Sequence, residues 1–222
     1  MKGDIVIVQA HHQKVARVIV PTIIDKIREK KRIYTITVGG ESGSGKSEIS
    51  LAIANELNRN GIKTIIFGQD DYFYLPPKSN SDRRREDPDW LGPHIEVNLD
   101  LLENNLLEAI QGKPETIKPL VDYNTNTIEM QTVSLQGVQV IIAEGTYTTL
   151  LKNIDLKLFI TRDWHLTLED RKKRSRGTEV HDPFTEGILS VEHKIIAGHK
   201  HLADIIINDS YEVISSVTEL PG

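Results

Sequence analysis

The run from Gly40 to Ser47, GESGSGKS, is the feature that most constrains the fold of this chain. It fits the spacing G-x-x-x-x-G-K-[ST], in which backbone N–H groups and a lysine surround phosphate oxygens. A β-branched run at 33–38 precedes it, and apolar residues at helical spacing follow it over 48–60. The sequence therefore predicts a strand, a phosphate-binding loop and a helix, with a nucleoside triphosphate held by Gly40, Glu41, Ser42, Gly43, Ser44, Gly45, Lys46 and Ser47.

The last two loop residues have chemical roles in this interpretation. Lys46 would reach the β- and γ-phosphates, and the Ser47 hydroxyl would ligate Mg²⁺. The N-terminus of the following helix adds a partial positive charge that favours anions. The alternative, a Gly/Ser turn that carries GKS by accident, does not account for the flanking strand and helix.

Composition excludes several other classes of protein. The net charge of −5 over 222 residues argues against a general nucleic-acid binder, which usually carries a basic surplus. The absence of cysteine excludes disulfides, thiolate catalysis and Cys-based zinc sites. No apolar run reaches membrane-spanning length, and residues 1–4 do not begin a secretory signal. We expect a cytoplasmic protein without nucleic-acid or membrane partners.

Short aliphatic runs alternate with helical patterns along the chain. We expect strands at 33–38, 64–67, 138–143, 156–160 and 204–207, and helices at 48–60, 99–111, 165–176 and 188–201. This alternation predicts an α/β fold with a mostly parallel sheet and helices on both faces. Residues 75–98 form a long polar stretch, which we interpret as a loop on the substrate side.

Three segments outside the loop carry candidate chemistry. Asp70 follows the second strand, where a carboxylate would deprotonate an attacking hydroxyl. Glu144 ends an aliphatic strand, the usual place for a metal-linked acid beside a phosphate-binding loop. Arg171 and Arg174 share a helix face and, with Arg176, would close over the triphosphate. The alternatives are an Asp-rich turn, a Glu-Gly turn and a solvated basic helix.

Together these segments resemble, in matching order, the phosphoribulokinase/uridine kinase family of P-loop kinases. The resemblance runs from about residue 33 to 208 through GGESGSGKS, GQDDYFY, IIAEG, the arginine segment and ADIII. It implies the Rossmann-like sheet of a P-loop NTPase, ATP or GTP as donor, Mg²⁺, a possible homo-oligomer and a small lid at about 163–179. It also implies that Asp70 is the base, that Glu144 lies near the metal, and that Arg171 and Arg174 act from the lid, with Arg176 less securely matched. Residues 1–32 would be an N-terminal appendage, an edge strand at 5–8 and a helix interrupted by Pro21, before a kinase domain at 33–222.

The acceptor half, about 70–128, departs from the pyrimidine-nucleoside kinases that the chain resembles. Asp122 is retained, but Val121, Asn126 and Ile128 stand where those kinases carry Tyr, His and Arg. Because buried polar contacts give such sites their selectivity, a pyrimidine base is not assured. Our candidate acceptor-binding residues are Asp70, Tyr72, Asp87, Asp89, Asp122 and Tyr123.

Arg83, Arg84 and Arg85 lie beside this region and would suit an acceptor that already carries a phosphate. The alternative, which we favour, is a solvated cluster neutralised by the acids around it, Asp82, Glu86, Asp87 and Asp89. The function expected from the sequence is transfer of the γ-phosphoryl group of ATP or GTP to a hydroxyl of a small metabolite, first the 5′-hydroxyl of uridine or cytidine. Two alternatives stay open: a kinase of a phosphorylated sugar, and a nucleotide-driven switch without an acceptor.

Overall fold

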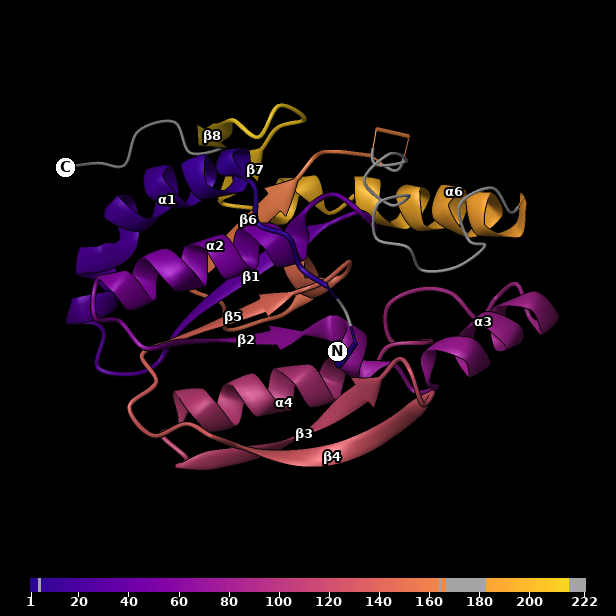
Figure 1. The fold of residues 1–222 in the computed structure, drawn as a ribbon, viewed down its shortest axis with the longest axis horizontal. Coiled ribbons are helices and arrows are strands. Elements are labelled where there is room, and N and C mark those ends of the chain that lie inside the picture. Colours follow the sequence, from indigo (N-terminus) through magenta and orange to yellow (C-terminus); the bar gives the residue numbers. More distant parts are fainter. Residues whose placement is uncertain (4, 164, 167–182, 216–222) are drawn as a thin grey trace.

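A six-stranded sheet forms the centre of the protein (Figure 1). The structure, a computed structural model, describes residues 1–3, 5–163, 165–166 and 183–215. The first five strands in spatial order are parallel and the last is antiparallel, which confirms the predicted mostly parallel sheet. In that order they are β2 (Thr64–Gly68), β5 (Val140–Glu144), β1 (Tyr34–Gly40), β6 (Leu156–Ile160), β7 (Ile205–Ile207) and β8 (Val213–Ser215).

Helices cover both faces of this sheet, as predicted (Figure 1). The α-helices among the described residues are α1 (Ala10–Glu29), α2 (Lys46–Arg59), α3 (Pro77–Glu86), α4 (Leu99–Ile110) and α6 (Pro183–Ala197). Short 3₁₀ turns are η1 (Gln69–Tyr72), η2 (Thr148–Leu150) and η4 (Lys200–Leu202). A separate antiparallel hairpin consists of β3 (Glu115–Asp122) and β4 (Thr127–Ser134). The helix expected at 165–176 lies outside the described residues.

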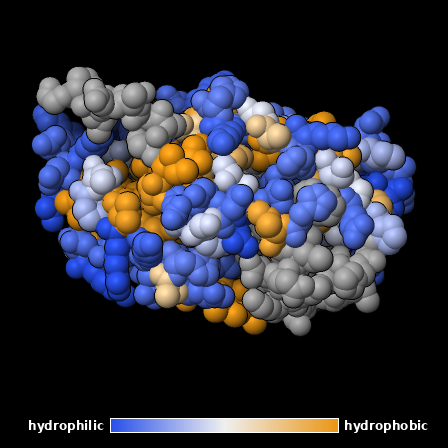
Figure 2. Space-filling model, turned by 90° about the horizontal axis from the view of Figure 1, so that it is seen from above, coloured by the Kyte–Doolittle hydropathy of each residue, from blue (hydrophilic) through white to orange (hydrophobic). Residues whose placement is uncertain are grey.

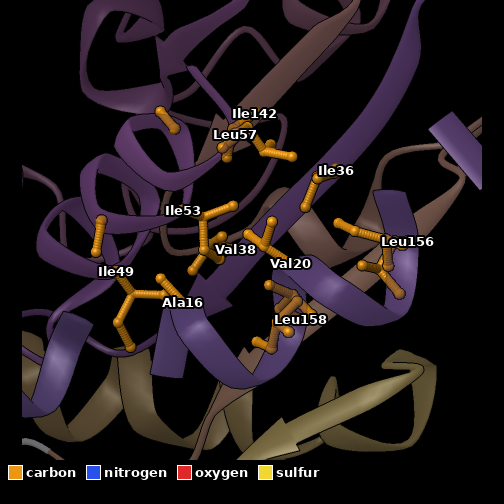
Figure 3. Close-up of a cluster of buried hydrophobic side chains, with 14 of the residues drawn as sticks. Ala16, Val20, Ile36, Val38, Ile49, Ile53, Leu57, Ile142, Leu156 and Leu158 are labelled. Atoms are coloured by element: carbon orange, nitrogen blue, oxygen red, sulfur yellow. The ribbon is translucent and has the colours of Figure 1, made fainter. Parts of the chain in front are cut away.

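Strand residues alternate between two apolar clusters, because successive side chains of a strand point to opposite faces. In β5, Val140 and Ile142 belong to the cluster that α1 and α2 cover, whereas Ile141 and Ala143 belong to the cluster that α4 and α6 cover. Figure 3 shows the first cluster, in which Ile53 of α2 lies beside Val38 of β1. Both faces of the sheet are therefore buried, as the continuous aliphatic runs of its strands require.

Helix α1 is a layer of this core. Its buried positions Val15, Ile19, Ile23 and Ile27 recur every four residues and pack in the same cluster as β1 and α2. Pro21 lies inside the helix without ending it; it occupies the exposed face, where water can satisfy the carbonyl that loses its partner. The edge strand predicted at 5–8 does not form, and no strand is assigned there. Residues 5–8 have no neighbouring strand in the described part of the chain, so their backbone N–H and C=O groups cannot form the hydrogen bonds of a β-sheet.

We predicted a loop over residues 75–98, and this prediction is wrong in part, because the stretch contains α3. This helix has almost no apolar side chains, so it carries no periodic signal. The β3–β4 hairpin was also not predicted, because β3 buries polar side chains and exposes an apolar one, the reverse of the usual strand pattern. Thr116 and Lys118 are 2% and 3% exposed, whereas Ile117 between them is 56% exposed. Polar side chains face inward on this strand because partners on η1 and α4 bind them.

The face that Figure 2 shows, above α1 and β8, is largely hydrophilic, with its largest gathering of hydrophobic residues to the left of centre. Exposed apolar side chains of these two elements include Val18 and Ile214. In the described residues, no helix is both long enough and apolar enough to cross a membrane.

Candidate active site

The phosphate-binding loop joins the carboxyl end of β1 to the first residue of α2, at the sheet edge where ligands of open α/β sheets bind. Gly45 has φ +97° directly before α2, and a Cβ there would lie 2.7 Å from the Tyr211 hydroxyl oxygen. Only glycine fits this position. The Nζ of Lys46 donates to the Glu41 carbonyl oxygen over 2.8 Å, which holds the ammonium group above the loop.

Tyr211, between β7 and β8, forms the outer wall of this loop. Its hydroxyl donates to the Ser44 carbonyl oxygen over 3.2 Å. Its ring stacks on His11 at 4.3 Å between centroids and contacts His12 edge-on at 5.0 Å. Nothing in the sequence pointed to Tyr211, because it lies 167 positions from Ser44 and belongs to no motif.

Glu144 ends β5 at the floor of the site, paired in register with Val38 of β1 and Gly68 of β2. Its carboxylate accepts a hydrogen bond from the Ser47 hydroxyl. Burial, and then the negative charge of Asp70, raise the pKa of Glu144 to about 7, although the Lys46 ammonium opposes the shift. Two carboxylates with too little positive charge around them are suited to bind a cation.

The residues present fit Mg²⁺. A hydroxyl and a carboxylate are the hard oxygen donors that this ion prefers, and Mg²⁺ commonly takes one or two carboxylates together with phosphate oxygens. The described residues contain no group of three or more His, Cys, Asp or Glu side chains able to hold a metal alone. An ion bound at Ser47 and Glu144 would therefore need oxygens from the nucleotide and water.

Asp70 and Asp71 are adjacent in η1 and have different surroundings. Asp71 is buried and bound on two sides: Oδ2 lies 2.8 Å from Lys118 Nζ, and Oδ1 accepts from the Val121 N–H over 3.0 Å. Asp70 is half-buried and has no hydrogen bond or ion pair within the described part of the chain, and its charge acts on Glu144. The structure thus gives Asp71 an anchoring role and leaves Asp70 free to meet a ligand.

A close contact fixes η1 against the end of β5. The Gln69 side-chain Oε1 accepts from the Tyr147 N–H over 2.7 Å. Gly145 lies against the same side chain so closely that an added Cβ would be 2.2 Å from Gln69 Cβ. The position of Asp70 relative to Glu144 therefore depends on glycine at residue 145.

The remaining acceptor candidates do not converge on one point. Tyr72 lies in the core, and its hydroxyl donates to Asn105 Oδ1 over 2.9 Å. Asp122 binds Lys2 Nζ at 2.9 Å and accepts from two backbone N–H groups of its own turn, so hydrogen bonding to Lys2 lowers the pKa of Asp122. The Tyr123 N–H donates to the Lys2 carbonyl oxygen. Asp122 and Tyr123 thus lie where residues 2–3 meet the β3–β4 hairpin.

The interpretation that we favoured for the α3 arginines agrees with Arg83, which pairs with one of the acids that it named, but not with Arg84 or Arg85, whose partners are Glu96 and Phe184. Arg83 pairs with Asp87 at 2.9 Å and lies over the Trp90 ring, and Arg84 pairs with the fully buried Glu96 at 2.6 Å. The Arg85 guanidinium lies 4.0 Å from the Phe184 ring centroid. Asp87 is therefore engaged by Arg83, while the exposed Asp89 donates its N–H to Asp87 Oδ1.

Arg171, Arg174 and Arg176 lie outside the described residues, and so does most of the expected lid. The structure adds two residues that the sequence did not suggest, both on α6. Glu192 bonds to the Ser42 side chain, and His193 Nδ1 lies 2.6 Å from Glu41 Oε1. No local signal predicts these contacts, because the two His193–Glu41 partners are 152 positions apart.

Known proteins are similar to this chain in sequence and in fold. The sequence model of the phosphoribulokinase/uridine kinase family matches residues 35–212. A uridine kinase of Staphylococcus epidermidis is 29% identical over 182 residues, which span 78% of this chain and 86% of that protein.

Two solved structures have the same fold with little sequence identity. Phosphoribulokinase from Rhodobacter spheroides matches with a TM-score of 0.62 and 15% identity, over 82% of this chain and 74% of that one. D-glycerate 3-kinase from Cryptococcus neoformans matches with a TM-score of 0.63 and 14% identity, over 93% and 99%. These names describe different acceptors, so the fold alone does not select one. The match over residues 35–212 confirms the resemblance: the chain belongs to the phosphoribulokinase/uridine kinase family and is a P-loop kinase of small metabolites.

Proposed function

We propose that the protein transfers the γ-phosphoryl group of ATP, or of GTP, to a hydroxyl of a small metabolite in a Mg²⁺-dependent reaction. The first candidate acceptor is the 5′-hydroxyl of uridine or cytidine. The observation that carries the proposal is the convergence of four side chains at one sheet edge: Asp70 acts on Glu144, which is bonded to Ser47 beside Lys46.

Each residue has a separate task in this proposal. Asp70 accepts the proton of the acceptor hydroxyl as its oxygen attacks phosphorus. Lys46 binds the β- and γ-phosphates and offsets the charge that develops between them. Ser47 and Glu144 would hold Mg²⁺, which supplies charge neutralisation on the phosphate oxygens when bound. Arg171, Arg174 and Arg176 would complete the site from the lid.

The surroundings of α3 support an uncharged acceptor over a sugar phosphate. Arg83 and Arg84 are already paired with Asp87 and Glu96, and separating Arg84 from a fully buried carboxylate is costly. A phosphorylated sugar, as in phosphoribulokinase, remains the alternative acceptor. It would have to find its phosphate contacts elsewhere or break these pairs.

A panel of acceptors tests the proposal. The protein is incubated with Mg-ATP, then with Mg-GTP, and with uridine, cytidine, nicotinamide riboside, ribulose 5-phosphate, pantothenate or glycerate. The release of nucleoside diphosphate is followed, and the product is identified by mass spectrometry. Turnover of uridine or cytidine alone supports the proposal. Turnover of ribulose 5-phosphate alone replaces it with the sugar-phosphate alternative.

The Asp70→Asn variant tests the base. We expect a loss of turnover of about 100-fold or more, with the Kd for Mg-ATP unchanged within about twofold, because Asp70 acts on the acceptor. Asp25→Asn is the matched control, since Asp25 is an exposed α1 residue whose side chain is 87% exposed. Full activity of Asp70→Asn would remove Asp70 from the mechanism.

A further inference from the structure

Glu41 places a carboxylate inside a loop that must bind phosphates. It occupies the first variable position of the loop, and the residue is only 7% exposed. A buried negative charge close to phosphate oxygens opposes their binding, because the Coulomb energy of two like charges is large where water is excluded. The loop therefore needs something to hold this carboxylate away from the phosphates.

His193 of α6 supplies that contact. Its Nδ1 lies 2.6 Å from Glu41 Oε1. An Nδ1–H group donates to a carboxylate both in the neutral tautomer and in the imidazolium ion, so the contact exists in either protonation state. The bond directs the Glu41 carboxylate toward α6.

The main chain of Glu41 also binds the side chain of Lys46. Lys46 Nζ donates to the Glu41 carbonyl oxygen over 2.8 Å. The next loop residue, Ser42, is bonded to Glu192, the neighbour of His193 on α6. Two consecutive residues of one helix thus hold two consecutive residues of the loop, and through Glu41 they set the position of Lys46.

Helix α6 also reaches the acceptor side. Its second residue, Phe184, lies under the Arg85 guanidinium of α3, and Ile195 Cδ1 lies 3.6 Å from where a Cβ of Gly92 would be. Figure 1 shows α6 and α3 at the same end of the molecule. One rigid element therefore contacts the nucleotide loop and the acceptor segment.

On the basis of the proposed function, in which the loop binds the nucleotide, we propose that His193 is a positioning residue for that nucleotide: it binds the Glu41 carboxylate, keeps that charge off the phosphate site and fixes the loop carbonyl that holds Lys46. A His193→Ala substitution removes this contact from the Glu41 carboxylate beside the loop. The affinity for Mg-AMP-PNP, a non-hydrolysable donor analogue, should fall about 10-fold, and KM for ATP should rise with it, while KM for the acceptor changes less than twofold.

A second substitution separates this role from a merely structural one. Removing the carboxylate as well, in Glu41→Ala/His193→Ala, should restore most of the lost affinity, so the double variant binds Mg-AMP-PNP more tightly than His193→Ala alone. His193→Asn keeps a donor near the Nδ1 position and should retain an affinity within about threefold of the wild type. Lys194→Gln, an exposed neighbour on α6, is the matched control and should bind like the wild type.

Calorimetric titration of each full-length variant with Mg-AMP-PNP measures these affinities, and circular dichroism of the same samples confirms that each is folded. The proposal is overturned if His193→Ala binds within twofold of the wild type. It is equally overturned if the double variant binds no more tightly than His193→Ala, because the lost affinity would then not come from the Glu41 carboxylate that lost its contact with His193. His193→Asn gives the same decision if His193→Ala does not fold: a loss of affinity beyond 10-fold in a folded Asn variant contradicts the proposed role.

Discussion

The guanidinium of Arg84 and the carboxylate of Glu96 meet at 2.6 Å, and Glu96 is fully buried. The same carboxylate accepts from Asn80 Nδ2 and from the Gly92 N–H. It therefore ties α3, which has almost no apolar side chains, to the segment that follows it. Charged and polar side chains that looked like ligands in the sequence are, in part, the framework of the site.

Glu96→Gln should destabilise the protein by about 2–4 kcal/mol, because an amide leaves the Arg84 charge without its buried partner. Denaturation with urea at pH 7.5 measures the free energy of unfolding. Glu86→Gln is the control: its pair with Arg83 is exposed and 3.9 Å long, so the change should stay within about 0.5 kcal/mol. Equal effects of the two substitutions would contradict the role assigned to Glu96.

Gly145→Ala should lower kcat by about 100-fold, because the new methyl group would displace Gln69 and with it the adjacent Asp70. The same overpacking should cost about 1–3 kcal/mol of stability. Gly61→Ala is a matched control, since Gly61 also has a positive φ but nothing within 4 Å of an added Cβ. It should lose about 1 kcal/mol of stability and no activity. Steady-state kinetics and urea denaturation check both; a fully active Gly145→Ala variant would disprove the argument.

Glu144→Gln should make the metal-free protein more stable relative to the wild type as pH rises. The pKa of Glu144 is about 7 in the folded protein and 4.5 ordinarily, so between these values the folded state binds more protons than the unfolded state. The stability that Glu144 contributes is fully present below about pH 4.5 and is lost as pH rises through 7. Urea denaturation in EDTA at pH 5, 6, 7 and 8 should show the difference widening and then levelling. If the difference in unfolding free energy between Glu144→Gln and the wild type did not change with pH, the pKa of Glu144 would not be raised in the folded protein.

Asp155→Asn should destabilise the protein by about 2 kcal/mol at pH 7, because Lys30 Nζ and the two terminal nitrogens of Arg32, Nη1 and Nη2, donate to this carboxylate. Burial alone would raise the pKa of Asp155, but hydrogen bonds from Lys30, Thr35 and Arg32 outweigh it and hold the pKa below its usual value. A lowered pKa means that this stability is present above pH 4 and is lost as pH falls through the folded pKa.

Thermal unfolding of Asp155→Asn and the wild type from pH 7 down to pH 3 checks that this stability is lost as pH falls. The gap between Asp155→Asn and the wild type should close at low pH. Asp25→Asn, which removes an exposed partner 4.0 Å from Arg28, should behave like the wild type throughout. If the difference in stability between Asp155→Asn and the wild type stayed constant down to pH 3, the negative charge of Asp155 would not contribute to stability.

The donor half of the candidate site could be proposed from the sequence, because its chemistry is local. Gly45, Lys46 and Ser47 are adjacent in the chain, and β-branched and helical patterns fix the strand and helix beside them. Glu144 could be placed because parallel strands bring their carboxyl ends to one edge. The acceptor half could not be predicted in this way, since α3 lacks apolar periodicity and β3 faces Lys118 inward.

The sequence by itself determined that this chain is an α/β phosphate-loop protein, because short-range spacing of glycine, lysine and β-branched residues dictates that local geometry. Only the tertiary structure decided which of two adjacent carboxylates is free, since Lys118 from a distant hairpin binds Asp71 and leaves Asp70 unbound in the described chain. It alone also brought His193 to Glu41 across 152 positions. Such contacts depend on how layers pack on the sheet, and no local pattern of residues encodes that arrangement.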